Sequence, residues 1–249
     1  MSDRPPVLWQ YTFSNYNEKA RWALDFKRIP HRRRSLLPGS PRAFRFSAGD
    51  GTIPVLDIDG DRIVDSTRII EALERRFEER PVYPADPDDR ACALALEEFF
   101  DEEAGHDVRR VAFWDMRDVP GYIPRFLATG FGTAARVWSR ATASVAWAYA
   151  SRRYAFRAED VERSRERIVA ALDRIEAERD GREYLVGDTF TVADLTAAAL
   201  LYPLAWPAEL QYSPPAPPRW EFGESLADHP SVAWIRETYR RHRGVSAEA

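Results

Sequence analysis

The chain has 249 residues, of which 45% are hydrophobic and 31% are charged, and its formal net charge is −4, a balance typical of one or two globular domains with a sizeable core. This charge does not indicate a nucleic-acid-binding surface, and the sequence contains neither an apolar signal segment near its polar N-terminus nor about 18 consecutive uncharged apolar residues that could span a membrane. We therefore expect a cytoplasmic protein that binds neither nucleic acid nor a membrane.

The first third of the chain alternates between strand and helix patterns. Residues 7–11 are apolar and aromatic, which is typical of a buried strand. Residues 18–27 repeat apolar side chains at helical spacing, and Arg21 and Asp25 stand four positions apart, where an ion pair stabilises a helix. The Arg-rich run at 31–34 is short and is expected to face solvent.

Further patterns complete this first domain. They predict a strand at 32–37, a short helix at 42–46, strands at 55–58 and 62–64 joined by an Asp-Gly turn, and a helix from 65 to about 77. The order strand–helix–strand–helix–strand–strand–helix indicates a complete α/β domain at residues 1–84.

Strand patterns nearly vanish after prolines at 81, 84 and 87, which mark a linker. Helices are predicted at 91–113, 133–156, 158–179, 191–204 and 230–242. Residues 85–249 are therefore expected to form an all-helical domain. Its single cysteine, Cys92, excludes an internal disulfide and fits a reducing compartment. Because Cys92 stands in an apolar helical stretch, we expect it to be buried.

The segment Thr-Ile-Pro-Val, which ends at residue 55, places a proline at the start of a strand, where proline cannot donate to the ladder. One explanation is a cis peptide bond before Pro54 that turns the backbone of Ile53 outward. The N–H and C=O of Ile53 then pair with an extended peptide ligand. The alternative is an ordinary trans proline at a strand start.

Two serines stand at predicted helix starts, where hydroxyl and backbone N–H groups favour negative charge. Ser66 follows Asp65 and can hold a ligand carboxylate. Ser14, between the first strand and the first helix, can stabilise a thiolate. The alternative for both serines is a plain helix cap.

The segment Phe-Thr-Val-Ala-Asp-Leu at 190–195 has a different role. Thr191 and Asp194 match a capping box in which Asp replaces Glu, with apolar residues at the staple positions. This pattern is structural, and it specifies the start of the nearly all-apolar helix at 191–204.

Taken together and in this order, these four patterns resemble the cytosolic glutathione transferases over nearly the whole chain. The resemblance implies a thioredoxin-like N-terminal domain and an all-helical C-terminal domain. In that family the residue matching Pro54 is cis, the residue matching Ile53 pairs with the cysteinyl backbone of glutathione, and the pair matching Asp65 and Ser66 holds the γ-glutamyl group. The resemblance further implies a homodimer.

The segment that begins at Ser14 is similar to the Ser- or Cys-first members of the family, because Ser14 lies five positions before Lys19 and Arg21 follows. We therefore expect Ser14 to stabilise the thiolate, with Tyr16 and Tyr11 as alternatives. The chain departs from the family pattern at 46–50. In that family a basic residue contacts the glycyl carboxylate of glutathione, and here the candidates for that contact are the arginines at 42 and 45. Another small thiol remains an alternative to glutathione.

The second-substrate pocket is expected between the first helix and the long helix at 91–113, under an elongated helical hairpin at 119–157. Together with Tyr16, the candidates on the long helix are Phe100, Glu103, His106, Arg110, Phe113 and Trp114; the alternative is that most of them are core. No histidine or cysteine cluster predicts a metal site. We expect an enzyme that activates a thiol, most simply glutathione, for attack on an apolar electrophile. The alternatives are a non-catalytic binding or regulatory protein and a glutathione-dependent disulfide reductase.

Overall fold

The computed structural model describes residues 4–47, 52–153, 157–215 and 219–249. A four-stranded mixed sheet in the order β2–β1–β3–β4 forms the centre of the N-terminal domain. Its strands are β1 (Val7–Gln10), β2 (Arg32–Ser35), β3 (Val55–Ile58) and β4 (Asp61–Val64). β1 is parallel to β2 and antiparallel to β3, and β3 and β4 form the expected hairpin.

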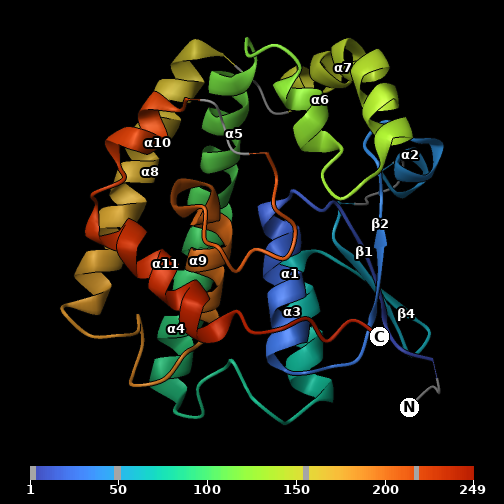
Figure 1. Ribbon diagram of the computed structural model, residues 1–249. Helices are drawn as coiled ribbons and strands as arrows, with labels where there is room; N and C mark the ends of the chain where they lie inside the picture. Colours follow the sequence, from blue (N-terminus) through green and yellow to red (C-terminus); the bar gives the residue numbers. More distant parts are fainter. Residues whose placement is uncertain (1–3, 48–51, 154–156, 216–218) are drawn as a thin grey trace.

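Three helices cover this sheet: α1 (Asn15–Phe26), α2 (Pro41–Ser47) and α3 (Ser66–Arg76). In Figure 1, α1 and α3 lie between the sheet and the helical domain. Trp9 of β1 packs on Phe46 of α2, with ring centroids 4.6 Å apart, whereas the adjacent Leu8 is fully buried. This difference follows from the alternation of side chains along a strand. The predicted order of elements and the thioredoxin-like architecture are confirmed.

The described part of the C-terminal domain is helical (Figure 1). Its elements are α4 (Pro87–Phe99), the π-helical turn η1 (Phe100–Ala104), α5 (Gly105–Met116), α6 (Tyr122–Leu127), α7 (Thr133–Arg153), α8 (Ala158–Arg179), α9 (Val192–Ala205), α10 (Glu221–Ser225) and α11 (Pro230–His242). The long helix expected at 91–113 is present, but η1 interrupts it. The end of the helix expected at 133–156 lies outside the described residues. No helix in the described ranges is long and apolar enough to cross a membrane.

The start of α9 has the predicted capping box. Asp194 Oδ2 accepts from the Thr191 N–H at 2.8 Å, and the Thr191 hydroxyl accepts from the Ala193 N–H. Burial raises the pKa of Asp194 to about 6. The helix that follows is buried along nearly its whole length, and it packs on α1, α4 and α11. α9 is thus the central helix against which both domains pack.

Helix α1 is buried on every side, although its sequence predicts one apolar face. All residues from 15 to 25 are buried, because α3 and α9 pack against α1, which lies between the sheet and the helical domain (Figure 1). The buried charged side chains of α1 form ion pairs. Arg21 pairs with Glu18 at 2.8 Å rather than with Asp25, so the expected pair four positions apart is not formed.

Two further expectations need correction. The run at 31–34 is solvated on one side only, because its side chains alternate in direction: Arg32 and Arg34 are exposed, whereas His31 and Arg33 are buried. Arg33 pairs with Asp25 at 2.7 Å. Cys92 is exposed on α4, since the buried face of that helix is turned toward α9 and includes Ala93 and Leu96 instead.

Candidate active site at the domain interface

The turn between β1 and α1 carries Ser14 at the boundary of the two domains. Ser14 is the N-cap residue of α1, with an extended backbone. Its N–H donates to the Tyr11 carbonyl at 3.3 Å, and its carbonyl accepts from the Glu18 N–H at 2.9 Å. The Ser14 hydroxyl makes no capping hydrogen bond. Ser14 is half-buried at the N-terminus of α1, where the helix dipole is positive, and its hydroxyl does not cap that helix.

The loop before β3 contains a cis peptide bond between Ile53 and Pro54, as one of the two sequence alternatives predicts. The side chain of Asn17 joins this loop to the Ser14 turn. Its Nδ2 donates to the Ile53 carbonyl at 3.3 Å, and its Oδ1 accepts from the Tyr11 N–H at 3.0 Å. The sequence did not single out Asn17, which stands three positions after Ser14 and is fully buried.

Asp65 and Ser66 differ in what their side chains do. Asp65 has a φ of 85° and caps α3, because its Oδ1 accepts from the backbone N–H groups of Thr67 at 3.0 Å and Arg68 at 3.2 Å. The Ser66 hydroxyl is buried and has no hydrogen-bond partner among the described residues. The plain-cap alternative therefore applies to Asp65 and not to Ser66.

A buried lysine lies beside the start of α3. Lys19 Nζ is 2.7 Å from the Thr67 hydroxyl, 2.5 Å from Asp101 Oδ1 and 3.0 Å from Glu97 Oε1. The Lys19 side chain is fully buried, and its ammonium group contacts side chains of α3, α4 and η1. The sequence places Lys19 in a predicted helix, but it does not reveal the lysine's partners, because Glu97 and Asp101 are distant in the chain.

Tyr16 points into the helical domain. Its hydroxyl donates to the Asp101 carbonyl at 2.6 Å and lies 3.1 Å from His106 Nδ1. Burial, reinforced by the charge of Asp101, raises the pKa of Tyr16 well above its ordinary value. The Tyr16 hydroxyl is therefore occupied by hydrogen bonding at the domain interface. Phe100, another expected pocket residue, is fully buried in the core.

His106 lies in the first turn of α5, next to Tyr16. Its Nδ1 lies 3.0 Å from an Arg109 guanidinium nitrogen, and its ring centroid is 5.1 Å from that of Tyr16. Part of His106 faces solvent, but burial of the ring and the charge of Arg109 lower its pKa to about 4. His106 is thus neutral near pH 7 and can offer a polar contact at the edge of the domain interface.

An aromatic surface extends from the Ser14 turn into the helical domain. Tyr11 stacks on Phe13 at 5.7 Å, Phe13 contacts Phe126 of α6 at 5.2 Å, and Phe126 meets Phe113 of α5 edge-on at 5.7 Å. All four side chains are half-buried. The structure thus connects Phe113 to the turn through Phe126 and Phe13, two residues that the sequence did not single out.

The other expected pocket residues lie elsewhere. Arg110 donates to Asp107 at 2.7 Å and to Ser164 of α8 at 2.8 Å, so it belongs to the α5–α8 contact rather than to the side facing α1. Glu103 is exposed, and Trp114 is half-buried under Arg117. The two arginines considered for the glycyl carboxylate are on α2, where Arg42 stacks on Trp9 and Arg45 is exposed.

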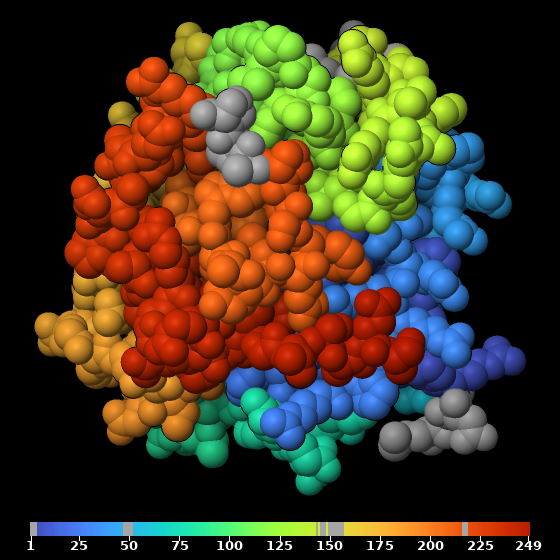
Figure 2. Space-filling view, in the orientation of Figure 1, coloured from blue at the N-terminus to red at the C-terminus, as the bar shows by residue number. Residues whose placement is uncertain are grey.

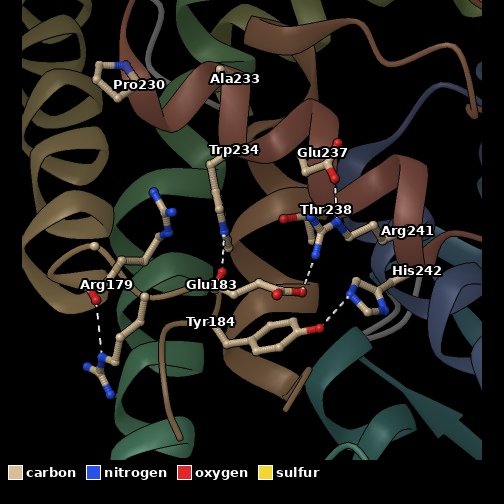
Figure 3. Close-up of a pocket in the computed structure, with 12 residues that line it drawn as sticks. Arg179, Glu183, Tyr184, Pro230, Ala233, Trp234, Glu237, Thr238, Arg241 and His242 are labelled. Carbon is tan, nitrogen blue, oxygen red and sulfur yellow. Dashed lines mark hydrogen bonds and ion pairs between the residues drawn. The ribbon is translucent and has the colours of Figure 1, made fainter. Parts of the chain in front are cut away.

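A separate pocket of about 460 Å³ lies between the end of α8 and α11 (Figure 3). Several of its polar side chains contact one another: Arg241 pairs with Glu183 at 2.5 Å, and the Tyr184 hydroxyl lies 3.2 Å from His242 Nε2. None of the site residues expected from the sequence lines it. Within the described ranges, no group of three or more His, Cys, Asp or Glu side chains is placed to hold a metal ion.

Comparison with known proteins matches both domains. The family model of the glutathione S-transferase N-terminal domain matches residues 8–81, and that of the C-terminal domain matches residues 138–235. A probable maleylacetoacetate isomerase of Caenorhabditis elegans is 31% identical over 99 residues, which are 39% of this chain. The alignment spans 46%, or about half, of that relative.

Solved structures share the fold at low identity. The beta-etherase LigF from Sphingobium sp. strain SYK-6 has a TM-score of 0.68 at 18% identity, over 95% of each chain. A glutathione S-transferase from Methylobacillus flagellatus KT with GSH bound has a TM-score of 0.65 at 18% identity, over 96% of this chain and 100% of that one. The chain therefore belongs to the glutathione S-transferase family, which confirms the family expected from its sequence.

Proposed function

We propose that the protein activates the thiol of glutathione for attack on an apolar electrophile. Glutathione lies extended along the backbone of Ile53, its γ-glutamyl carboxylate meets the start of α3 at Ser66, and its sulfur reaches the Ser14 hydroxyl. The observation that carries this proposal is the buried Ser66 hydroxyl, which has no hydrogen-bond partner in the part of the chain that the structure describes. A buried polar group is costly unless something satisfies it, and a ligand carboxylate at a helix N-terminus does so.

The Ser14 hydroxyl supplies the activation. Lowering a thiol pKa by one unit requires about 1.4 kcal/mol of preferential stabilisation of the thiolate. A hydrogen bond to a charged group contributes about 1.5–3 kcal/mol, so one bond from Ser14 lowers the thiol pKa by about one to two units. The hydroxyl is available because it does not cap α1. The positive end of α1 acts in the same direction.

The electrophile binds on the aromatic surface formed by Tyr11, Phe13, Phe113 and Phe126. This surface begins one residue before Ser14, so an acceptor stacked on it lies next to the thiolate. Holding both reactants in place removes much of the entropic cost of a bimolecular reaction. The thiolate sulfur forms the new C–S bond, and the acceptor releases its leaving group or takes up a proton.

Binding and turnover test the proposal separately. The protein is expected to be retained on immobilised glutathione, to be stabilised by glutathione more than by other small thiols, and to conjugate a chlorodinitrobenzene-type acceptor. At a glutathione concentration of one hundred times Kd, the stabilisation is about 2.7 kcal/mol. Retention without turnover of any acceptor would instead support a non-catalytic binding or regulatory protein, and stabilisation by a different thiol alone would exclude glutathione.

A second candidate reaction is a thiol-dependent cis–trans isomerisation. It is favoured by the similarity to the probable maleylacetoacetate isomerase, which covers only part of each chain. In this reaction the thiolate adds to a conjugated double bond, the resulting single bond rotates, and the thiolate leaves unchanged. Catalytic rather than stoichiometric use of glutathione with a conjugated cis-alkene would identify it.

The family resemblance also supports a homodimer. We expect sedimentation velocity to give about twice the mass of the 28.6 kDa chain. A species of single-chain mass over the whole range of concentrations tested would rule the dimer out.

A further inference from the structure

The turn that carries Ser14 is held by a buried guanidinium. Arg21 donates to the carbonyl of Thr12 at 3.2 Å, to that of Tyr11 at 3.4 Å and to the Gln10 side chain at 2.8 Å. The first two carbonyls belong to the residues just before Phe13 and Ser14. Arg21 is 2% exposed, so water does not compete for these donors. The path of the turn, and with it the direction of the Ser14 hydroxyl, depends on how Arg21 is oriented.

Arg21 is oriented by Glu18, and Glu18 in turn is held by Arg243. Glu18 Oε2 accepts from Arg21 Nε at 2.9 Å, while Oε1 accepts from Arg243 Nε at 2.5 Å. Burial by itself favours the neutral carboxyl, but the charges of Arg243 and Arg21 outweigh it and lower the pKa of Glu18 to about 2. Loss of either guanidinium leaves a buried carboxylate that is only partly compensated, so it must protonate or move.

Arg243 is itself fixed by the C-terminal segment, residues 243–249. Its Nη1 donates to Asp25 Oδ2 at 2.9 Å, and Asp25 Oδ1 accepts from the Ala247 N–H at 2.8 Å. The N–H of Ala249 donates to the His31 carbonyl at 2.8 Å. Figures 1 and 2 show this segment, in red, crossing from α11 to the N-terminal domain. The last residues of the chain therefore pack against the first domain and carry Arg243 under α1.

We propose that Arg243 is a positioning residue for thiol activation, acting through Glu18 and Arg21 on the turn that carries Ser14. The proposal rests on the proposed function. Arg243 is fully buried, so it acts on Ser14 indirectly, and the hydrogen bonds through Glu18 and Arg21 are the path that leads to the turn. Small displacements of a catalytic donor are costly, since a shift of about 1 Å can reduce a rate by about a hundredfold.

The test compares substitutions at Arg243, the residue that follows α11, with a control arginine on α11. Arg243→Met removes the guanidinium and keeps much of the volume, whereas Arg243→Lys keeps the charge. Arg240→Met is the control, because Arg240 is exposed and its ion pair is with Glu237 on the same helix. The measurements are kcat, KM for glutathione, the thiol pKa from the pH dependence of kcat/KM, and amide hydrogen exchange of residues 11–15.

For Arg243→Met we expect kcat to fall at least tenfold, the thiol pKa to rise, and exchange of residues 11–15 to accelerate, with KM for glutathione changed less than threefold. Arg243→Lys is expected to restore part of each quantity, and Arg240→Met to match the wild type. If Arg243→Met does not fold, Glu18→Gln is expected to show the same changes, because it interrupts the same path at its middle.

A lower melting temperature combined with wild-type kcat, thiol pKa and exchange at residues 11–15 would mean that Arg243 is only structural, and the proposal would be wrong. If the wild-type protein itself does not turn over glutathione, it is the proposed function that fails. In that case the exchange measurement still decides whether Arg243 holds the turn, since unchanged exchange in Arg243→Met overturns the coupling.

Discussion

The buried Ser66 hydroxyl has no hydrogen-bond partner within the described ranges, so its substitution is expected to affect stability and ligand binding in opposite directions. We expect Ser66→Ala to leave the free energy of unfolding equal to or above the wild-type value, because removing an unpaired hydroxyl removes a cost of about 1–3 kcal/mol. The same change should raise Kd for glutathione about tenfold or more, since a hydrogen bond to a carboxylate contributes about 1.5–3 kcal/mol. Urea unfolding and calorimetric titration measure the two effects.

Ser231 provides a matched control for this experiment. It is also fully buried, but its hydroxyl donates to the Leu172 carbonyl at 2.7 Å. Ser231→Ala is therefore expected to destabilise the protein and leave glutathione binding unchanged. If Ser66→Ala instead behaves like Ser231→Ala, the Ser66 hydroxyl has a structural partner and no role at the ligand.

Ser14 is expected to act on turnover rather than on binding. Ser14→Ala removes one donor to the thiolate and should lower kcat by about tenfold to a hundredfold, with KM for glutathione within about threefold of wild type. Steady-state kinetics over a range of pH measures both, and the thiol pKa should rise in parallel. A full effect from Tyr11→Phe, with none from Ser14→Ala, would assign the thiolate to the tyrosine.

The lowered pKa of Glu18 makes the stability of the protein depend on pH in the acid range. The pKa of Glu18 is lowered from 4.5 to about 2, so between these values the unfolded chain binds more protons than the folded one. The contribution of Glu18 to stability is therefore complete above about pH 4.5 and is lost as the pH falls toward 2. Urea unfolding should show a shallower decline in this window for Glu18→Gln than for wild type. Equal slopes would contradict the ionised, doubly paired carboxylate.

At the scale of elements, the contact between α1 and α5 depends on a glycine. A Cβ atom on Gly105 would lie 2.7 Å from the Tyr16 hydroxyl and 3.0 Å from Leu200 Cδ1. Gly105→Ala is expected to destabilise the protein by about 1–3 kcal/mol, the usual cost of overpacking. Because the closest atom is the hydroxyl, Tyr16→Phe should be less damaging in the Gly105→Ala background than in wild type. A double-mutant cycle by urea unfolding measures this coupling, and additive effects would contradict it.

Some elements could be predicted from local sequence and others could not. The α9 start was predictable because Thr191 and Asp194 satisfy backbone groups within one turn. Helix α1 was predicted as a helix, but its complete burial was not, because the helices that pack against it, α3 and α9, are distant in the sequence. The exposure of Cys92 was likewise missed, since the apolar residues around it do not indicate which face of α4 meets α9.

At the scale of the whole molecule, buried charges cross between the domains. Glu18 and Asp25 of α1 pair with Arg243, and Lys19 pairs with Asp101. Separating the domains would expose or orphan these charges, so we expect the two domains to unfold together. Differential scanning calorimetry should give a single transition with equal calorimetric and van't Hoff enthalpies, and two resolved transitions would contradict this cooperativity.

The sequence by itself determined the order of elements, the thioredoxin-like and helical domains, and the placement of Ser14, Ile53 and Ser66 at turns and helix ends. These features depend on residues close together in the chain, where proline, capping residues and hydrophobic period act locally. Only the tertiary structure decided that Asn17, Phe126 and Arg243 belong beside them. Their roles come from pairing across many residues of sequence, because a buried charge or aromatic ring is defined by what packs around it and not by its neighbours in the chain.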